Sequence, residues 1–190
     1  MDLQEAIRAR RSIGKVKADP VPRALIERIV ESAIWAPNHH RTEPWKFVVI
    51  TGDGRLKLGR AYAEIAAETL KDAAEEEREQ RLAREAAKAL RAPVVIAVAC
   101  SPSQAPKVLR AEELAAVHAA VQNMLLTAHA SGLGAIWRTG EPVYHPAMRQ
   151  ALGFAAGEEV VGLIYIGYPD MAPPPAERSS AIAKTVWLTE

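Results

Sequence analysis

Apolar residues recur at helical spacing in several stretches of the chain. Asp2 can cap a short first helix, and a second helix is predicted over residues 22–36, opening at a proline. Residues 55–91 combine Ala, Glu, Arg and Lys with apolar positions at the same spacing, which predicts two helices with a solvated charged face. A helix over 112–131 is apolar almost all round, so we expect it to lie centrally or at an interface. A shorter helix is predicted over 146–152.

Strands are predicted where apolar and β-branched residues are continuous. Residues 45–51 end at a Gly-Asp-Gly turn, and 135–138 form a short strand after two glycines. The segments 93–101 and 160–166 are apolar on both alternating faces, which is typical of central strands. Residues 184–188 also have a strand-like pattern, at the end of an extended segment.

These elements predict one α+β domain spanning residues 1–190, with helices packed around a four- to five-stranded mixed sheet. Helices outnumber strands, and regular strand-helix-strand alternation is missing from the pattern. Residues 170–190 contain three consecutive prolines and form an extended C-terminal arm. A strand beyond such an arm is suited to exchange with a second subunit, so we expect a homodimer with an exchanged C-terminal strand.

The composition of the chain argues against several classes of function and indicates where the protein is located. The 190 residues include 24 Lys and Arg against 23 Asp and Glu, and a net charge of +1 does not favour binding to nucleic acid or to an anionic membrane. Cys100 is the single cysteine, and no apolar run follows Met1, so we expect a cytoplasmic protein without disulfides or a signal peptide. Aromatic residues make up only 5% of the chain, which indicates that part of the core is shared with a partner subunit or a planar cofactor.

Two polar motifs suggest anion binding. Arg10, Arg11 and Ser12 follow the first helix and combine two guanidinium groups with a hydroxyl, a set that suits phosphate, although a basic surface turn has the same pattern. Arg138 leaves a buried strand beside a glycine, where ligand-binding residues are common. The phosphate-loop, dinucleotide-fold, zinc-protease and serine-hydrolase motifs do not occur in the sequence.

Residues 36–45 form the densest polar cluster, between a helix and a strand. Hydrogen bonding to a polar ligand and ordinary loop histidines are both compatible with His39 and His40. We expect no metal site, because neighbouring histidines seldom converge on one ion and Cys100 is distant in sequence. The spacing of serines and histidines also gives no support to a nucleophilic serine.

Together, three segments resemble the FMN-dependent nitroreductase family, and more closely its short subgroup of NAD(P)H nitroreductases. These are residues 10–12, the loop from Ala36 to Trp45, and the stretch Gly132 to Gly140. The resemblance runs from Leu3 to about Tyr168 and implies a nitroreductase-like fold. It further implies FMN as cofactor, NAD(P)H as co-substrate and a homodimer with FMN sites at its interface.

The resemblance also implies roles for individual residues. Arg10, Arg11 and Ser12 would hold the FMN phosphate and ribityl chain, and residues from the strand end would close the same site. Two residues would reach the flavin from the partner chain, and the end of the long helix matches the subgroup's nicotinamide-cofactor region. The strand-end residues are Trp137, Arg138 and Thr139, the partner residues are Trp35 and His39, and the nicotinamide region comprises Thr127, Ala128, His129, Ala130, Ser131 and Gly132.

The chain departs from the family at positions that matter for chemistry. Many relatives carry an arginine where Gly14 stands here, and an aromatic residue at Val16. A cation near flavin N1 and the C2 carbonyl stabilises the reduced anion, so its loss would lower the flavin potential unless another cation, such as Lys15, compensates. Asn38, Arg41 and Glu43 also differ from many relatives, and these differences affect substrate choice.

The resulting functional hypothesis is ping-pong transfer of hydride from NAD(P)H through FMN to a nitroaromatic, quinone or similar small-molecule acceptor. The flavin performs the redox chemistry, so few catalytic side chains are required. The alternative is a flavin-binding storage or sensing protein with little turnover, which Gly14 makes worth testing. A third interpretation, a ligand-free protein docking through residues 55–91, is disfavoured by the balanced charges of that segment.

Overall fold

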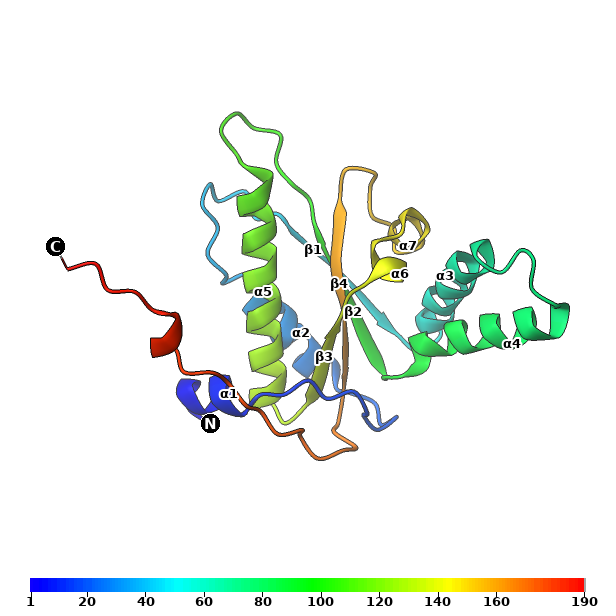
Figure 1. The fold of residues 1–190 in the computed structure, drawn as a ribbon, viewed down its shortest axis with the longest axis horizontal. Helices are drawn as coiled ribbons and strands as arrows, with labels where there is room; N and C mark the ends of the chain where they lie inside the picture. The colour runs from blue at the N-terminus through cyan, green and yellow to red at the C-terminus, as the bar shows by residue number, and fades with distance from the viewer. Residues whose placement is uncertain (190) are drawn as a thin grey trace.

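The structure is a computed structural model that describes residues 1–189 (Figure 1). Its described elements alternate between helices and strands without a regular βαβ repeat. The strands are β1 (Trp45–Thr51), β2 (Val94–Cys100), β3 (Gly134–Arg138) and β4 (Glu159–Gly167), and the helices are α1 (Leu3–Ala9), α2 (Arg23–Ala33), α3 (Gly54–Glu68), α4 (Glu75–Ala86), α5 (Arg110–Ala130), α6 (Glu141–Tyr144) and α7 (Pro146–Ala151), with 3-10 turns η1 (Ala87–Leu90) and η2 (Ile182–Lys184).

The four strands form one sheet in the order β1-β2-β4-β3, and each neighbouring pair is antiparallel. The sheet therefore differs from the mixed arrangement that the sequence predicts. The physical reason is the hairpin of α3 and α4, which returns the chain to the end of the sheet that it left, so that Thr51 pairs with Val94. The parallel contact in the described chain is the isolated bridge between Ser12 and Ala135.

Helices cover both faces of the sheet, which explains the two-sided apolar strands. In Figure 1 the sheet separates α1, α2 and α5 from α3, α4, α6 and α7. Every residue of β2 is buried, and so is all of β4 after its first residue. One core cluster joins α2 and α5 to one face, and a second joins α3 and α7 to the other. The α+β class with central β2 and β4 is thereby confirmed.

The long helix α5 has one buried face and one exposed, uncharged face. Val117, Val121 and Met124 pack against the sheet with no exposed surface. No Asp, Glu, Lys or Arg follows Glu113 within the helix. Its exposed side therefore lacks the charges that a solvated helix normally presents. The residues on that side include Ala115, His118, Gln122 and Ala130.

The C-terminal arm runs past α1 and leaves the body of the molecule (Figure 1). Residues 184–188 form no strand in this single chain, because no neighbouring strand pairs with them. Trp187 and Leu188 are 81% and 92% exposed. Exchange of this segment with a second subunit stays a prediction.

Candidate functional site

A group of basic side chains lies where α1 meets the C-terminal end of α5. Arg10 and Arg11 follow α1, and the Arg11 guanidinium donates to the carbonyls of Arg8 at 2.6 Å and Arg10 at 2.8 Å. Burial, Arg11 and Arg178 lower the pKa of the Arg10 guanidinium. Neither Arg10 nor Arg11 forms an ion pair within residues 1–189. The cluster thus concentrates positive charge that these residues do not neutralise.

His129, in the last turn of α5, belongs to the same group. Its Nε2 atom is buried and has no hydrogen-bond partner in the described chain. Burial lowers the pKa of this imidazole, and Arg10 and Arg11 lower it further. A buried polar atom without a partner is costly, and such an atom beside two guanidinium groups indicates a place for an anionic ligand.

Edge strand β3 connects this basic cluster to a second group of candidate residues. The Ile13 amide donates to the carbonyl of Ala135 at 3.0 Å, so the main-chain groups of Ala135 face outward from the sheet. Residues two apart in an antiparallel strand face the same side, and the amide and carbonyl of Trp137 therefore also face the open edge. From Ala135 to Arg138 the strand covers about 10 Å, which is roughly 3.3 Å per residue.

The Trp137 ring is fixed by close packing against β4. Its Nε1 donates to the carbonyl of Val161 at 3.1 Å. A Cβ at Gly162 would lie 1.9 Å from this nitrogen, so the ring can occupy its place only because position 162 has no side chain. The ring of His118, from α5, lies near the indole, with its centroid 5.7 Å from that of Trp137.

Arg138 points to the opposite face of the sheet from Trp137. Its guanidinium carbon lies 5.5 Å from the centre of the Tyr165 ring, and its Nε is buried without a partner in the described residues. It lines a cavity of about 340 Å³ between the end of β3, α6 and η1. The structure therefore does not bring Arg138 into the Arg10 cluster, but places it at the other end of β3.

The polar loop after α2 is pinned to the N-terminal end of α5 by the buried carboxylate of Glu113. Asn38 Nδ2 and Thr42 Oγ1 donate to its Oε1 at 3.3 and 2.5 Å, and the Ser103 amide donates to Oε2 at 3.0 Å. Burial alone would raise the pKa of Glu113, but the hydrogen bonds from Thr42, Ser103 and Asn38 lower it. The loop is consequently a fixed part of the structure.

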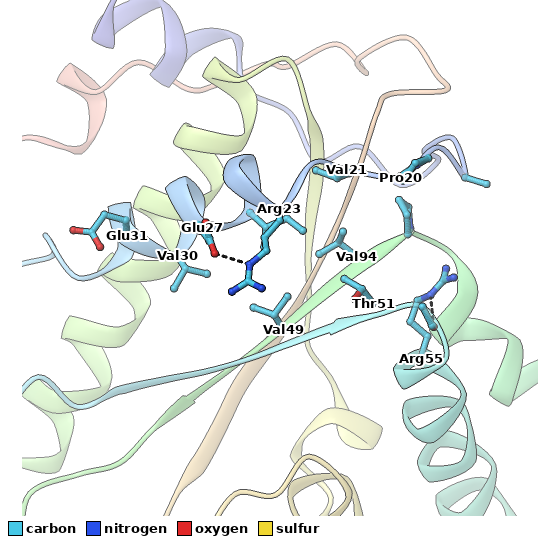
Figure 2. Close-up of a pocket in the computed structure, with 14 residues that line it drawn as sticks. Pro20, Val21, Arg23, Glu27, Val30, Glu31, Val49, Thr51, Arg55 and Val94 are labelled. Atoms are coloured by element: carbon cyan, nitrogen blue, oxygen red, sulfur yellow. Dashed lines mark hydrogen bonds and ion pairs between the residues drawn. The ribbon is translucent and has the colours of Figure 1, made fainter.

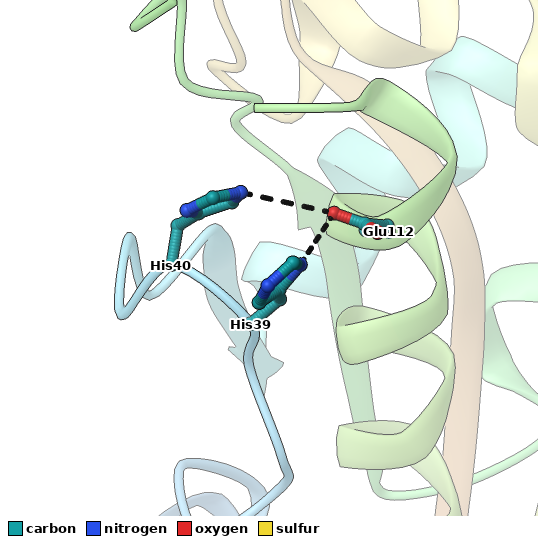
Figure 3. A group of neighbouring side chains, drawn as sticks. All are labelled: His39, His40 and Glu112. Carbon is teal, nitrogen blue, oxygen red and sulfur yellow. Dashed lines mark hydrogen bonds and ion pairs between the residues drawn. The ribbon is translucent and has the colours of Figure 1, made fainter. Parts of the chain in front are cut away.

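The two loop histidines converge on the neighbouring Glu112, as Figure 3 shows. His39 Nδ1 lies 2.9 Å and His40 Nε2 lies 3.9 Å from the same carboxylate oxygen. The two imidazole rings stack with centroids 4.1 Å apart. Glu112 therefore brings both rings to one carboxylate oxygen, although neighbouring histidines seldom converge, and the expectation of no metal site stays a prediction.

Within one chain, the two predicted halves of the site are far apart. Glu112 and His129 lie at opposite ends of α5, about 25 Å apart at roughly 1.5 Å per helical residue. His39 contacts Glu112, whereas Arg10 lies near His129. Trp35 is 76% exposed. A single ligand the size of FMN cannot contact both ends of this helix in one chain.

The predicted nicotinamide region forms the last turn of α5 and the turn into β3. Ala128 is fully buried in the core, and Gly132 has the positive φ of 76° that ends the helix. His129 is the member of this region that joins the basic cluster. Nicotinamide binding by residues 127–132 remains a prediction.

Several residues of these clusters carry no signal of their role in the sequence. Glu112 and Glu113 lie more than 70 residues from the loop that they hold, and Lys88 and Arg91 lie in a segment whose pattern indicates a solvated face. Arg178 lies in the C-terminal arm. Only Glu113 has a local signal, a carboxylate among the apolar residues of the long helix.

A hollow of about 840 Å³ lies on the other side of the molecule, beside the free edge of β1. It lies between α2 and the ends of β1 and β2 (Figure 2). Val21, Ile26 and Val49 contribute apolar walls, and Arg23 at its rim pairs with Glu27 at 2.7 Å. The two arginines that line the hollow, Arg23 and Arg55, both have partners, because Arg23 pairs with Glu27 and Arg55 donates to the Ala92 carbonyl.

Comparison with solved structures supports the fold in detail. A nitroreductase-like family protein from Bacillus cereus matches with a TM-score of 0.86 and 30% identity, over 100% of this chain and 97% of that one. A nitroreductase-type protein from Desulfovibrio desulfuricans, solved in complex with FMN, matches with a TM-score of 0.73 and 28% identity, over 100% and 96% of the two chains. The described residues contain no helix long and apolar enough to cross a membrane.

Sequence comparison identifies the family. The chain is 33% identical to the "Putative NAD(P)H nitroreductase" YfhC of Bacillus subtilis (strain 168), over 93% of this chain and 89% of the relative. It is 32% identical to YdjA of Escherichia coli (strain K12), which has the same description, over 90% of each chain. The Nitroreductase family matches residues 7–168. This protein therefore belongs to the Nitroreductase family.

Proposed function

We propose that the protein is an FMN-dependent oxidoreductase that transfers hydride from NAD(P)H to a nitroaromatic, quinone or similar conjugated acceptor. The observation that carries this proposal is the pair Arg10 and Arg11, which form no ion pair in the described chain, beside the buried and unpartnered Nε2 of His129 at one end of an open strand edge. The FMN in the Desulfovibrio complex and the descriptions of YfhC and YdjA as NAD(P)H nitroreductases support the same chemistry.

The residues present suit FMN in their charge and in their placement along β3. Arg10, Arg11 and the exposed Ser12 would hold the phosphate and the start of the ribityl chain, and the orphaned Nε2 of His129 lies in the same cluster. The ribityl chain would then follow β3, whose outward main-chain groups can pair with the polar edge of a flavin. Trp137, Arg138 and Thr139 would receive the ring at the end of the strand.

When bound, FMN would supply the redox chemistry, accepting hydride at N5 and passing it on. The side chains of this protein therefore need only bind, orient and exclude water. Arg10 and Arg11 anchor the phosphate by charge, and the main chain at Trp137 orients the ring. The Trp137 side chain, whose Nε1 donates to the Val161 carbonyl, would pack beneath the ring.

The second half of each site comes from a partner subunit. If His39 and Arg10 contact the same FMN, their separation along α5 calls for two chains, and an antiparallel pairing of two α5 helices through their uncharged faces would bring opposite ends together. Trp35 and His39 would then reach the flavin of the other subunit. A homodimer with two interfacial FMN sites satisfies both conditions.

The C-terminal arm would complete the partner's sheet. Val186, Trp187 and Leu188 are almost fully exposed, and β1 has a free edge beside the apolar hollow shown in Figure 2. A strand added at this edge would pair its main chain with β1 and bury its apolar side chains. Deletion of residues 182–190 should therefore convert the dimer to monomer in size-exclusion chromatography with light scattering, and a dimer that persists contradicts the exchange.

NAD(P)H would donate its hydride in the same slot that the acceptor later occupies. Residues 127–132 are the proposed contact for the nicotinamide cofactor, beside the basic cluster that Arg10 and His129 form. The charge of this cluster suits the phosphates of a dinucleotide. The acceptor would be a planar, electron-poor small molecule.

The test is to reconstitute the purified protein with FMN and record its absorbance, molecular mass and reactions. We expect one FMN per chain, a dimer, bleaching of the flavin by NAD(P)H under anaerobic conditions, and recovery of colour on adding a nitroaromatic or quinone. Bound flavin that NAD(P)H does not bleach would instead favour a storage or sensing protein. A colourless monomer after reconstitution would refute both interpretations.

Subunit complementation tests the shared site. Chains with Arg10→Ala and chains with His39→Ala should each bind FMN weakly as homodimers. In a mixed dimer one site carries both substitutions and the other carries neither, so half the wild-type FMN should bind. Equal weakness in the mixed dimer would mean that both residues act within one chain.

A further inference from the structure

The cavity at the Arg138 end of β3 carries positive charge that its walls do not neutralise. Lys88 of η1, Arg91 directly after it and Arg138 line this space of about 340 Å³. No Asp or Glu is among the described residues that line it. Neither Arg91 nor Arg138 forms an ion pair within residues 1–189. Lys88 pairs with Glu85, which lies outside the cavity, so two of the three cations have no counter-charge in this part of the chain.

Aromatic rings, and not carboxylates, lie against two of these cations inside the cavity. The guanidinium carbon of Arg138 lies 5.5 Å from the centre of the Tyr165 ring, and Lys88 Nζ lies 5.9 Å from that of Tyr62. A ring attracts a cation but does not neutralise its charge. The Nε of Arg138 is also buried without a hydrogen-bond partner in the described chain. Because an unpaired charge that is partly removed from water is costly, an anion in the cavity would stabilise this arrangement.

The two tyrosine hydroxyls add a neutral hydrogen-bond donor to the cavity. Tyr62 and Tyr165 are buried, and their hydroxyl oxygens lie 3.3 Å apart. This pair uses one of the two hydroxyl hydrogens and leaves the other for a second acceptor. Burial raises the pKa of both phenols, and the nearby Arg138 and Arg91 offset that rise only in part. Both hydroxyls therefore keep their hydrogens at neutral pH, and one of them can donate to an anion.

The rest of the wall is apolar. Ile136, Pro142 and Val143 line the cavity together with the tyrosine rings. Arg91 and Thr139 are exposed, so solvent reaches the rim of the cavity. Its volume lies near the lower end of the roughly 300–1,000 Å³ that is usual for small-molecule sites. A bare inorganic anion would leave the apolar walls without a contact, whereas an acid with a compact apolar body would contact both kinds of wall.

We propose that this cavity binds a small organic acid, with Arg91 and Arg138 holding its carboxylate and the apolar walls contacting its body. A planar guanidinium can bind a carboxylate through two parallel hydrogen bonds. The cavity lies at the far end of β3 from Ser12, which bridges to Ala135, and it is therefore separate from the proposed phosphate site. The proposal goes beyond the proposed function, because it does not require bound FMN.

The first test is calorimetric titration of the FMN-free protein with benzoate at fixed ionic strength. Benzamide is the neutral probe of the same shape, and inorganic phosphate is the anion without an apolar body. We expect one benzoate per chain, bound at least about tenfold more tightly than either of the other two probes. Benzamide that binds as tightly as benzoate would overturn the anion site. Phosphate that binds more tightly than benzoate would overturn the assignment to an organic acid.

Substitutions locate the bound acid. Arg138→Gln should weaken benzoate binding about tenfold or more, and Arg91→Gln should weaken it about threefold because Arg91 is exposed. Arg84→Gln, on the exposed face of α4 and outside the cavity, removes the same charge and should leave the affinity unchanged. Benzoate affinity that is unchanged in Arg91→Gln would overturn the proposal, and this variant keeps the test valid even where Arg138→Gln does not fold.

Titration of the FMN-saturated protein separates this proposal from the proposed function. We expect benzoate to bind with similar affinity in both forms and to leave the flavin in place. Competition between benzoate and FMN would assign the acid to the flavin site and overturn a separate cavity site. A protein that binds benzoate as expected but never binds FMN would overturn the proposed function and support the acid site.

Discussion

The two ends of α5 carry opposite charges, and they differ in whether the polar groups there have hydrogen-bond partners within the chain. At the N-terminal end, Glu113 receives hydrogen bonds from a side-chain amide, a hydroxyl and a main-chain amide, and its pKa is lowered. At the C-terminal end, His129 Nε2 has no hydrogen-bond partner and Arg10 forms no ion pair in the described chain; the pKa of each is lowered, although Glu5 acts against the shift of His129. The polar groups of the first cluster are paired within the chain, whereas the second contains cations and a buried imidazole nitrogen that the described residues leave without partners.

We therefore expect the Glu113 cluster to contribute to the stability of the fold and the Arg10 cluster to contribute to anion binding. A satisfied buried carboxylate stabilises the fold that surrounds it, and its removal leaves donors unpaired. Crowded cations without partners destabilise the free protein and lower their own pKa values, but they bind an anion more strongly for the same reason. Substitutions at the two ends should therefore affect different measurements.

The largest effect is expected for Glu113→Ala. Glu113 is 1% exposed, so the substitution would leave Asn38, Thr42 and the Ser103 amide without their acceptor. We expect the free energy of unfolding of the FMN-free protein to fall by about 3 kcal/mol. Urea unfolding at one fixed protein concentration measures this.

The pH dependence provides a check on the same residue. Because the folded-state pKa of Glu113 is lowered, its contribution is fully present above the unfolded pKa and is lost as the pH falls through the folded value. The stability difference between wild type and Glu113→Ala should therefore shrink in acid. A constant difference down to strongly acidic pH would show that the charge of Glu113 is not involved.

A smaller but more specific effect is expected for Arg10→Ala. Loss of a charge-assisted hydrogen bond should weaken FMN binding by about 1.5–3 kcal/mol, or roughly 10- to 150-fold. The FMN-free protein should unfold at the same or a higher urea concentration, because one of the crowded charges has been removed. Fluorescence titration of FMN measures the affinity. If Arg10→Ala destabilises the FMN-free fold as strongly as Glu113→Ala does, the contrast between the two ends is wrong.

His129 should make FMN binding depend on pH. Its folded-state pKa is lowered, so it is neutral near pH 7, and the FMN-free protein loses stability as the pH falls through the unfolded value of about 6.5. A bound phosphate favours the protonated imidazole, so FMN affinity should rise severalfold between about pH 8 and 6. His129→Gln supplies the control, since the phosphate's own titration persists there. Identical pH profiles in the two proteins would exclude His129 from the phosphate site.

The smallest effect is expected for Glu112→Gln. Its hydrogen bond to His39 is partly exposed to solvent, so the free energy of unfolding should change by less than about 1 kcal/mol. The Glu113 cluster would still hold the loop. A loss comparable to that of Glu113→Ala, measured by the same urea unfolding, would show that the exposed histidine contacts also hold the loop.

The sequence predicted the secondary structure well where a pattern had a single physical explanation. The two-sided apolar runs of β2 and β4 are typical of central strands, and Asp2 accepts from the Glu5 amide at 2.8 Å as a helix cap. The antiparallel order could not be predicted, because nothing local shows that α3 and α4 fold back on each other. Residues 184–188 form no strand in this chain, and their pairing with a second chain stays a prediction.

The candidate site could be predicted only in pieces. Arg10 to Ser12 and the loop around His39 are recognisable as local motifs, and the structure gives each a distinct place. The carboxylates that hold the loop and the cations beside Arg138 come together only through the long-range folding of α5 and η1. The alternation of side chains along β3 also separates Arg138 from Trp137, although the two are adjacent in sequence.

The close approach of Trp137 to Gly162 limits the order in which this part of the protein can evolve. A side chain at position 162 would collide with the indole nitrogen, so it becomes tolerable only after residue 137 has become smaller. A change at position 137 that comes first leaves a void, which a later substitution at 162 can fill. The two positions are therefore expected to change as a coupled pair, with the tryptophan as the obligatory first step.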